Sequence, residues 1–84
     1  MDIEYNDQQT LADLNTRLHI HSDFLYDYRL RLRKLNRRYK TCKRKRKSIT
    51  RLLIKEVKVE ISSTEVLING LLNEIKLEEL LNNE

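Results

Sequence analysis

The sequence has no proline, one glycine and one cysteine among its 84 residues. A single cysteine excludes an internal disulfide framework. Enzymes built from sheets and loops need glycine and proline in their turns, so we expect neither a walled substrate pocket nor an enzyme. No apolar run approaches the roughly 20 residues of a membrane span, and no secretory signal is recognisable. We therefore expect an intracellular protein, located in the cytoplasm, in the nucleus or inside a virion.

The chain is also short of hydrophobic surface. A domain of this size buries too little area to be stable without support from staples or partners. Its richness in Leu, Lys, Asn and Ile, with a single Ala, is typical of an AT-rich genome, such as that of a large DNA virus, a phage or a low-GC microbe. We therefore expect it to act as a part of something larger.

Charge is abundant and segregated into three blocks. The net charge is +4, but residues 1–28 carry −5, residues 29–51 carry +13 with no anion, and residues 52–84 carry −4. Such a pattern indicates either neutralisation by folding back or a polyanionic partner for the middle block.

Leucine and other apolar residues recur in steps of three and four, which is typical of a coiled-coil helix. Counted from Leu11, the series continues through Tyr39 and Cys42 to Ile49 and Leu53. We predict an all-α fold with a short tail over residues 1–9 and one long helix over residues 10–54. Asn6 and Gln9 have the spacing of a capping box at its start.

A second helix is predicted over residues 62–82, with Ser62 as N-cap, Glu65 at the reciprocal position, and Ile61 and Val66 as a hydrophobic staple. Residues 55–61 alternate and are rich in β-branched side chains, which predicts an extended connector between the helices. Gly70 lies inside the second helix at some cost to its stability, which points to close packing there. The apolar face of this helix is expected to comprise Leu67, Ile68, Leu71, Leu72, Ile75 and Leu80 or Leu81.

Two pairings fit the charges better than a parallel homodimer, in which cations would face cations. In a hairpin that turns near residue 58, Ile75 lies near Cys42, and Glu65 lies near Arg51. Alternatively, two copies of the long helix pair antiparallel and cross near Leu32. The hairpin and the antiparallel pairing of two copies are compatible, and together they would form a multi-helix assembly.

The first half of the long helix has no partner within a hairpin that turns near residue 58. This unmatched seam predicts a homo-oligomer or a subunit of a hetero-complex. The predicted interface comprises Leu11, Leu14, Leu18, Leu25, Tyr28, Leu32 and Leu35.

Seven cations of the middle block are spaced by three and four, and so would form one stripe about 33 Å long on the outer face of the long helix. These are Arg29, Arg33, Arg37, Lys40, Arg44, Lys47 and Arg51. Unpaired like charges at this spacing destabilise a helix, so a merely solvated face is a poor explanation. We expect the stripe to bind nucleic acid, largely without sequence specificity, through phosphate contacts. The alternatives are an acidic protein surface and an anionic membrane surface.

No residue pattern in the chain indicates catalysis or a cofactor. His19 and His21 point in different directions on a helix and have no closed set of ligand partners, so we predict no metal site. Cys42 lies among cations, which favour a thiolate, but it also occupies a seam position, where packing is the preferred interpretation.

Overall fold

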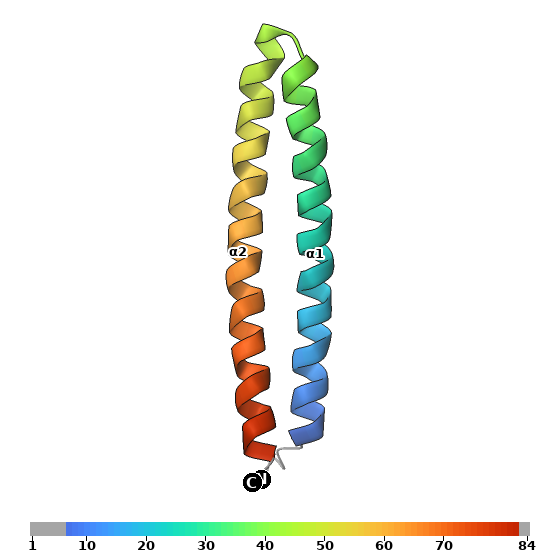
Figure 1. Ribbon diagram of the computed structural model, residues 1–84, viewed down its shortest axis with the longest axis vertical. Helices are drawn as coiled ribbons and strands as arrows, with labels where there is room; N and C mark the ends of the chain where they lie inside the picture. Colours follow the sequence, from blue (N-terminus) through green and yellow to red (C-terminus); the bar gives the residue numbers. More distant parts are fainter. Residues whose placement is uncertain (1–6, 83–84) are drawn as a thin grey trace, which may run out of the picture.

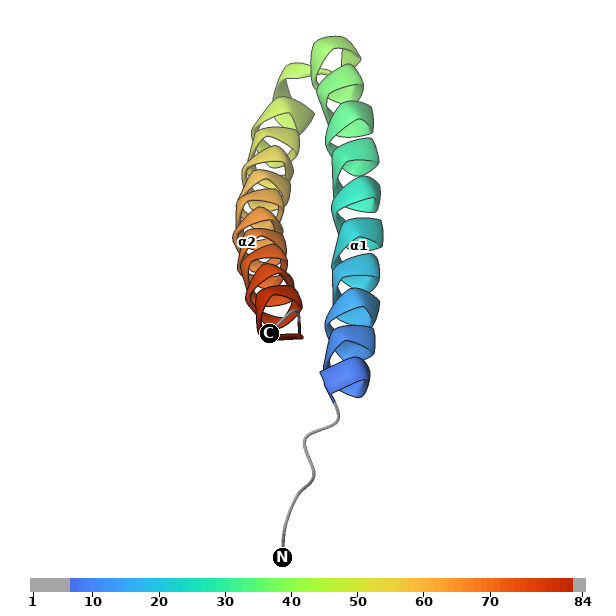
Figure 2. The ribbon, with the colours of Figure 1, turned by 60° about the horizontal axis from the view of Figure 1, so that its bottom comes forward.

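The computed structural model describes residues 7–82 as two long helices, α1 (Asp7–Thr41) and α2 (Arg44–Asn82). They run antiparallel as a hairpin, and the described residues contain no strand (Figure 1). The hairpin is a rod of 62 × 26 × 14 Å. A second view shows the helices side by side along their whole length (Figure 2). The predicted all-α helical hairpin is therefore confirmed.

The bounds of the helices differ from those predicted. The long helix expected over residues 10–54 ends at Thr41, and the chain turns at Cys42 and Lys43. The connector expected over residues 55–61 is wrong, because these residues lie inside α2. The separate second helix expected from residue 62 is the later part of α2, so Ser62 caps nothing. The capping residue proposed at Asn6 lies outside the described residues.

The hairpin seam follows a 4-3 spacing in both helices. On α1 it uses the predicted positions, from the half-buried Leu11 to the half-buried Cys42. On α2 the series is shifted, because the two residues of the turn reset which face points at α1. The α2 seam comprises Thr50, Ile54, Val57, Ile61, Thr64, Ile68, Leu71, Ile75 and Glu78.

The shifted seam explains why the predicted connector is helical. Val57 is 5% exposed, whereas Val59, only two residues later, is 61% exposed. Val57, Ile61 and Thr64 are separated by four and three residues and all face α1. Burial against α1 thus outweighs the weak β-propensity of this segment. Ile49, predicted to lie in the seam, is 61% exposed on the other side of α2.

Equal arms give the physical reason for a turn at residues 42 and 43. A turn near residue 58 would leave the first half of the α1 seam uncovered. With arms of 35 and 39 residues, every seam position of α1 meets α2. Burial of Leu14, which is 6% exposed, depends on this match. A turn here also separates the cations of α1, the last of which is Lys40, from the run of cations over residues 43–47, whereas one continuous helix would join them.

Two threonines lie buried in the seam without an unsatisfied hydroxyl. Thr50 Oγ1 donates to the carbonyl oxygen of Arg46 at 2.8 Å, and Thr64 Oγ1 donates to that of Glu60 at 2.7 Å. Each bond returns to the preceding turn of the same helix, as threonine hydroxyls do inside helices. The small core therefore tolerates two polar side chains.

Candidate nucleic-acid interface

The turn gathers the basic block at one end of the rod. We call residues 29–51 the basic tip: they comprise the last turns of α1, the link and the first turns of α2. They hold 13 cations and no anion, and all of these cations except the half-buried Lys47 are exposed. At 1.5 Å per residue, the tip occupies roughly the last 20 Å of the rod. The 13 positive charges are thus confined to about a third of the length of the molecule.

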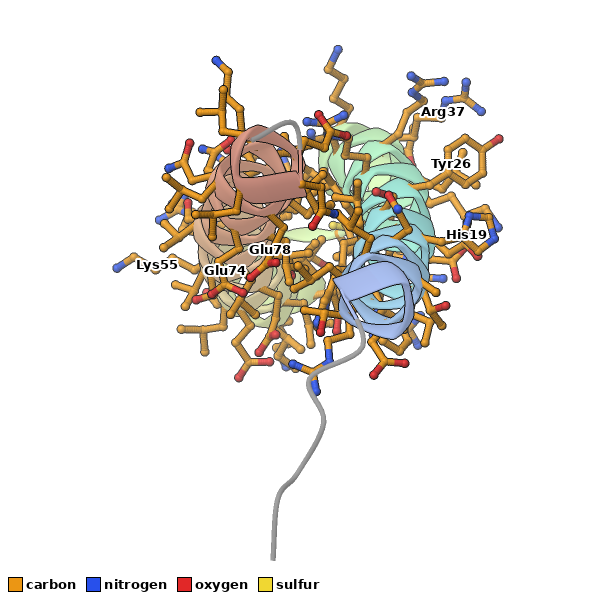
Figure 3. The ribbon with its side chains drawn as sticks, turned by 90° about the horizontal axis from the view of Figure 1, so that it is seen from below. His19, Tyr26, Arg37, Lys55, Glu74 and Glu78 are labelled. Atoms are coloured by element: carbon orange, nitrogen blue, oxygen red, sulfur yellow. The ribbon has the colours of Figure 1, made fainter. Side chains whose placement is uncertain are left out.

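The prediction that the seven cations form a single stripe on one helix is wrong, because the structure divides them between two helices. Arg29, Arg33, Arg37 and Lys40 lie on α1, whereas Arg44, Lys47 and Arg51 lie on α2. The part on α1 extends only about 17 Å rather than 33 Å. The end of the rod opposite the turn is called the open end. Seen from there, Arg37 projects from the outer side of α1, away from α2 (Figure 3). The cations therefore surround a blunt two-helix end instead of lining one edge.

Tyr39 organises two of the basic side chains on α2. Arg51 Nη2 donates to the Tyr39 hydroxyl at 2.7 Å, and Lys47 Nζ lies 5.4 Å from the centroid of the same ring. The hydrogen bond from Arg51 and the charges of Arg51 and Lys47 lower the pKa of Tyr39 below its ordinary value of 10.0. The same hydrogen bond raises the pKa of Arg51. Tyr39 thus joins the two helices within the tip and presents no free ring for stacking on a base.

The link between the helices leaves the start of α2 electrostatically unfavourable. The carbonyl oxygen of Lys43 accepts from Arg46 N at 2.9 Å and from Lys47 N at 3.1 Å, so Lys43 is the N-cap residue. Lysine offers no side-chain acceptor to the free N–H groups of the first turn. No acidic residue lies in that turn, although the helix dipole favours anions there. The end of α1 is the opposite case, because Arg38 and Lys40 in its last turn suit the dipole.

The rest of the rod is acidic. Residues 7–28 contain four Asp and one Arg, and residues 52–82 contain six Glu and three Lys. Arg29 at the edge of the basic tip forms an ion pair with Glu65, with 3.3 Å between Nη2 and Oε1. Toward the end opposite the turn, Glu74 and Glu78 project from α2 (Figure 3). They line a shallow surface with Arg17 and Leu14 of α1. The molecule is therefore strongly polarised along its length.

The seven residues predicted to form an intermolecular interface lie in the hairpin seam instead. Leu14 and Leu35 are buried, at 6% and 7% exposure. The other five are half-buried, namely Leu11, Leu18, Leu25, Tyr28 and Leu32. Leu25 lines a surface with Glu65 and Ile68 of α2, and Tyr28 lines another with Val57. The unmatched seam is therefore matched within the chain and gives no reason for self-association.

The histidines lie outside the basic tip, whereas Cys42 lies within it, in the link between the helices. His19 Nε2 lies 3.4 Å from Asp23 Oδ2 on an exposed side of α1. Cys42 is half-buried, with its Sγ 3.7 Å from the Tyr39 carbonyl oxygen and 4.0 Å from Thr50 Oγ1. In residues 7–82, no cluster of three or more His, Cys, Asp or Glu side chains is arranged to hold a metal ion. Neither described helix has a stretch long and apolar enough to cross a membrane.

A comparison with models of protein families, with curated proteins and with solved structures found no match for this chain.

The sequence pattern does not predict the contact of Tyr39 with Arg51 or the N-cap position of Lys43. The signal for the turn was present but faint: after Cys42 the apolar 4-3 series fits better when restarted from Thr50 than when continued to Ile49. No glycine, proline or asparagine marks the link, and no described residue has a positive φ. Only the position of the turn brings Tyr39 and Arg51 together.

Proposed function

We propose that this protein is a non-enzymatic helical hairpin that binds nucleic acid through its basic tip, largely without sequence specificity. The observation that carries the proposal is the concentration of 13 cations, with no anion, at one end of an otherwise acidic rod. Cations so close together repel one another, and a polyanion relieves that repulsion. We expect the protein to act where nucleic acid is present, inside a cell or a virion.

The shape of the tip favours contact with phosphates over contact with bases. Two helices side by side, each 10–12 Å across, are about 20 Å wide, whereas the major groove of B-DNA is only about 12 Å wide. The tip therefore fits across the sugar–phosphate backbone and does not enter the groove. Arginines such as Arg37 and Arg44 suit this role, because the guanidinium group forms bidentate hydrogen bonds with phosphate.

The first turn of α2 strengthens this interpretation. Its uncapped N–H groups and the positive end of its dipole attract anions, and the exposed side chains of Arg44, Lys45 and Arg46 add charge there. A phosphate bound at the tip would supply the acceptor that Lys43 lacks. Binding is then expected to stabilise the hairpin as well as to hold the nucleic acid.

The test is a titration of labelled double-stranded DNA and single-stranded RNA with the protein at salt concentrations from 50 to 200 mM. If four to six phosphates are neutralised, the logarithm of the binding constant falls with the logarithm of salt with a slope of about −4 to −5 for the DNA and about −3 to −4 for the single-stranded RNA. No binding at 50 mM salt, or binding that does not respond to salt, would show the proposal to be wrong.

A matched pair of variants separates the basic tip from net charge alone. Arg44→Gln, Lys45→Gln and Arg46→Gln together remove three tip cations, and Lys55→Gln, Lys58→Gln and Lys76→Gln remove three exposed cations from the rest of α2. Both triple variants have the same net charge. We expect the tip variant alone to lose affinity, with a salt slope weaker by about 2 to 3. Its loss cannot be ascribed to unfolding, since removing cations from a helix N-terminus favours the helix.

A second candidate is a structural subunit whose basic tip binds an acidic protein surface. The exposed apolar side chains on the outer side of α2 favour a place in a larger assembly. This function predicts a protein that co-purifies from the native source after nuclease treatment. It also predicts that the tip variant loses that protein while nucleic acid is bound by neither form.

A further inference from the structure

A second apolar stripe runs along α2 on the side that faces away from α1. Its residues are spaced by three and four, like those of the seam, and they begin at Ile49 and end at Leu80. Leu52, Val59 and Val66 are 62%, 61% and 71% exposed. The outer stripe comprises Ile49, Leu52, Glu56, Val59, Ser63, Val66, Gly70, Asn73, Leu77 and Leu80. The hairpin itself makes no use of this face.

Gly70 is the second sign that something covers the outer stripe. Glycine inside a helix costs roughly 1 kcal/mol relative to alanine. A Cβ added at Gly70 would meet nothing within 4 Å, so packing within the hairpin does not require the glycine. Its φ is not positive either, so backbone conformation does not require it. A missing side chain on an outer apolar face is what close approach by another helix needs.

We propose that two copies of the hairpin associate through the outer stripes of α2, antiparallel to each other, and form a four-helix assembly. Antiparallel alignment about a point between Thr64 and Glu65 places Ile49 opposite Leu80 and Leu52 opposite Leu77. The same alignment places Val59 opposite Gly70 and Val66 opposite Ser63. Each large apolar side chain therefore meets an apolar or a small one, as a self-complementary interface requires.

The polarity of the rod fixes the occupant and its direction. A parallel second copy would set one basic tip against the other, with 13 cations on each side. An antiparallel copy sets each basic tip beside the acidic open end of its mate. Arg51 of one copy then lies at the same height along the dimer axis as Glu78 of the other copy. This charge complementarity favours a second copy of this chain over a partner of unrelated charge, and it is independent of the proposed nucleic-acid function.

The first measurement is the molar mass in solution over a range of concentrations, by sedimentation equilibrium. We expect about twice the 10.2 kDa of the chain at high concentration. Gly70→Leu is the decisive variant, because it improves helix propensity and meets open space in the hairpin but blocks the approach of Val59 from the other copy. We expect it to be helical and monomeric, with its dissociation constant raised at least tenfold. A wild-type chain that is monomeric throughout would overturn the proposal.

A matched pair of double variants tests whether the outer stripe is the interface. Val59→Lys with Val66→Lys places two charges on the stripe, and Tyr26→Lys with Leu72→Lys places two charges at exposed apolar positions outside it. We expect the double variant on the stripe, Val59→Lys with Val66→Lys, to abolish association and the other double variant to retain it. Circular dichroism should show that both double variants are helical. Dimers that survive the stripe substitutions would overturn the assignment.

Spin labels distinguish an antiparallel from a parallel dimer. Each label is attached to a cysteine that replaces an exposed serine, Ser48 or Ser62, in a chain whose own cysteine is removed by Cys42→Ser. In an antiparallel dimer, position 48 of one copy lies opposite position 81 of the other. Labels at position 48 of the two copies are therefore separated by the length of 33 helical residues, about 50 Å. Labels at Ser62 are then within about 25 Å of each other, near the centre of the interface. A parallel dimer gives short distances at both positions and would overturn the antiparallel arrangement.

Discussion

Arg29 of α1 and Glu65 of α2 are 36 residues apart in the sequence, and their Nη2 and Oε1 atoms lie 3.3 Å apart. A hairpin that turned near residue 58 would instead have brought Glu65 to Arg51. This pair therefore reports the position of the turn. Both side chains are substantially exposed, at 61% and 47%, so the pair contributes little to stability.

A double-mutant cycle of Arg29→Gln and Glu65→Gln tests this register. We expect a coupling free energy of about 0.2–1 kcal/mol in thermal or urea unfolding, which decreases as salt is added. The control is the cycle of Arg51→Gln and Glu65→Gln, for which we expect no coupling. Coupling in the second cycle and none in the first would contradict the turn at Cys42 and Lys43.

Leu14→Ala tests whether the N-terminal leucines pack within the chain. Leu14 is 6% exposed, and its truncation should lower the free energy of unfolding by about 2–3 kcal/mol. Leu72→Ala is the control, because Leu72 is 46% exposed, and we expect less than about 1 kcal/mol there. Urea unfolding followed by circular dichroism measures both. Equal effects would mean that Leu14 is not covered by α2.

Thr64→Val is expected to stabilise the hairpin by up to about 1 kcal/mol. The Thr64 hydroxyl bonds only to the carbonyl oxygen of Glu60, which also lies within reach of a backbone N–H in the helix, so its removal leaves no buried group unpaired. Valine has nearly the same shape and buries a methyl group in the place of the hydroxyl. A rise in the unfolding temperature checks this, and a fall would show that the hydroxyl bond is needed.

Lys43→Ser should stabilise the turn by about 0.5–1 kcal/mol, since serine at an N-cap accepts from the free N–H groups of α2. Lys55→Ser removes the same charge from an exposed position inside the helix, where serine is less favourable than lysine, and is expected to destabilise slightly. The comparison uses unfolding temperature at equal salt. A destabilising Lys43→Ser would mean that α2 begins elsewhere.

Tyr39 should titrate below its ordinary value, because the hydrogen bond and charge of Arg51 lower its pKa. The difference between the absorbance titrations of the wild type and Tyr39→Phe gives the curve of this residue alone. Arg51→Gln should move that curve to higher pH. Because the folded pKa is depressed, the stabilisation from the phenolate is full only above the unfolded pKa of about 10 and is lost as pH falls through the folded value. An unchanged curve in Arg51→Gln would exclude the contact.

The all-α class, the seam of α1 from Leu11 to Cys42 and the cationic block over residues 29–51 could all be predicted from the sequence, because each follows from local spacing or composition. The position of the turn was decided only by tertiary structure. No glycine or proline marks Cys42 and Lys43, and the 4-3 series can be continued through them or restarted beyond them. The choice between these two depends on burying Leu14 and its neighbours, which happens only when α1 and α2 have nearly equal length. Because the chain turns at Cys42 and Lys43, the cations form a blunt basic tip rather than a 33 Å stripe. For the same reason the predicted interface residues lie inside the hairpin, and the outer stripe of α2 is exposed.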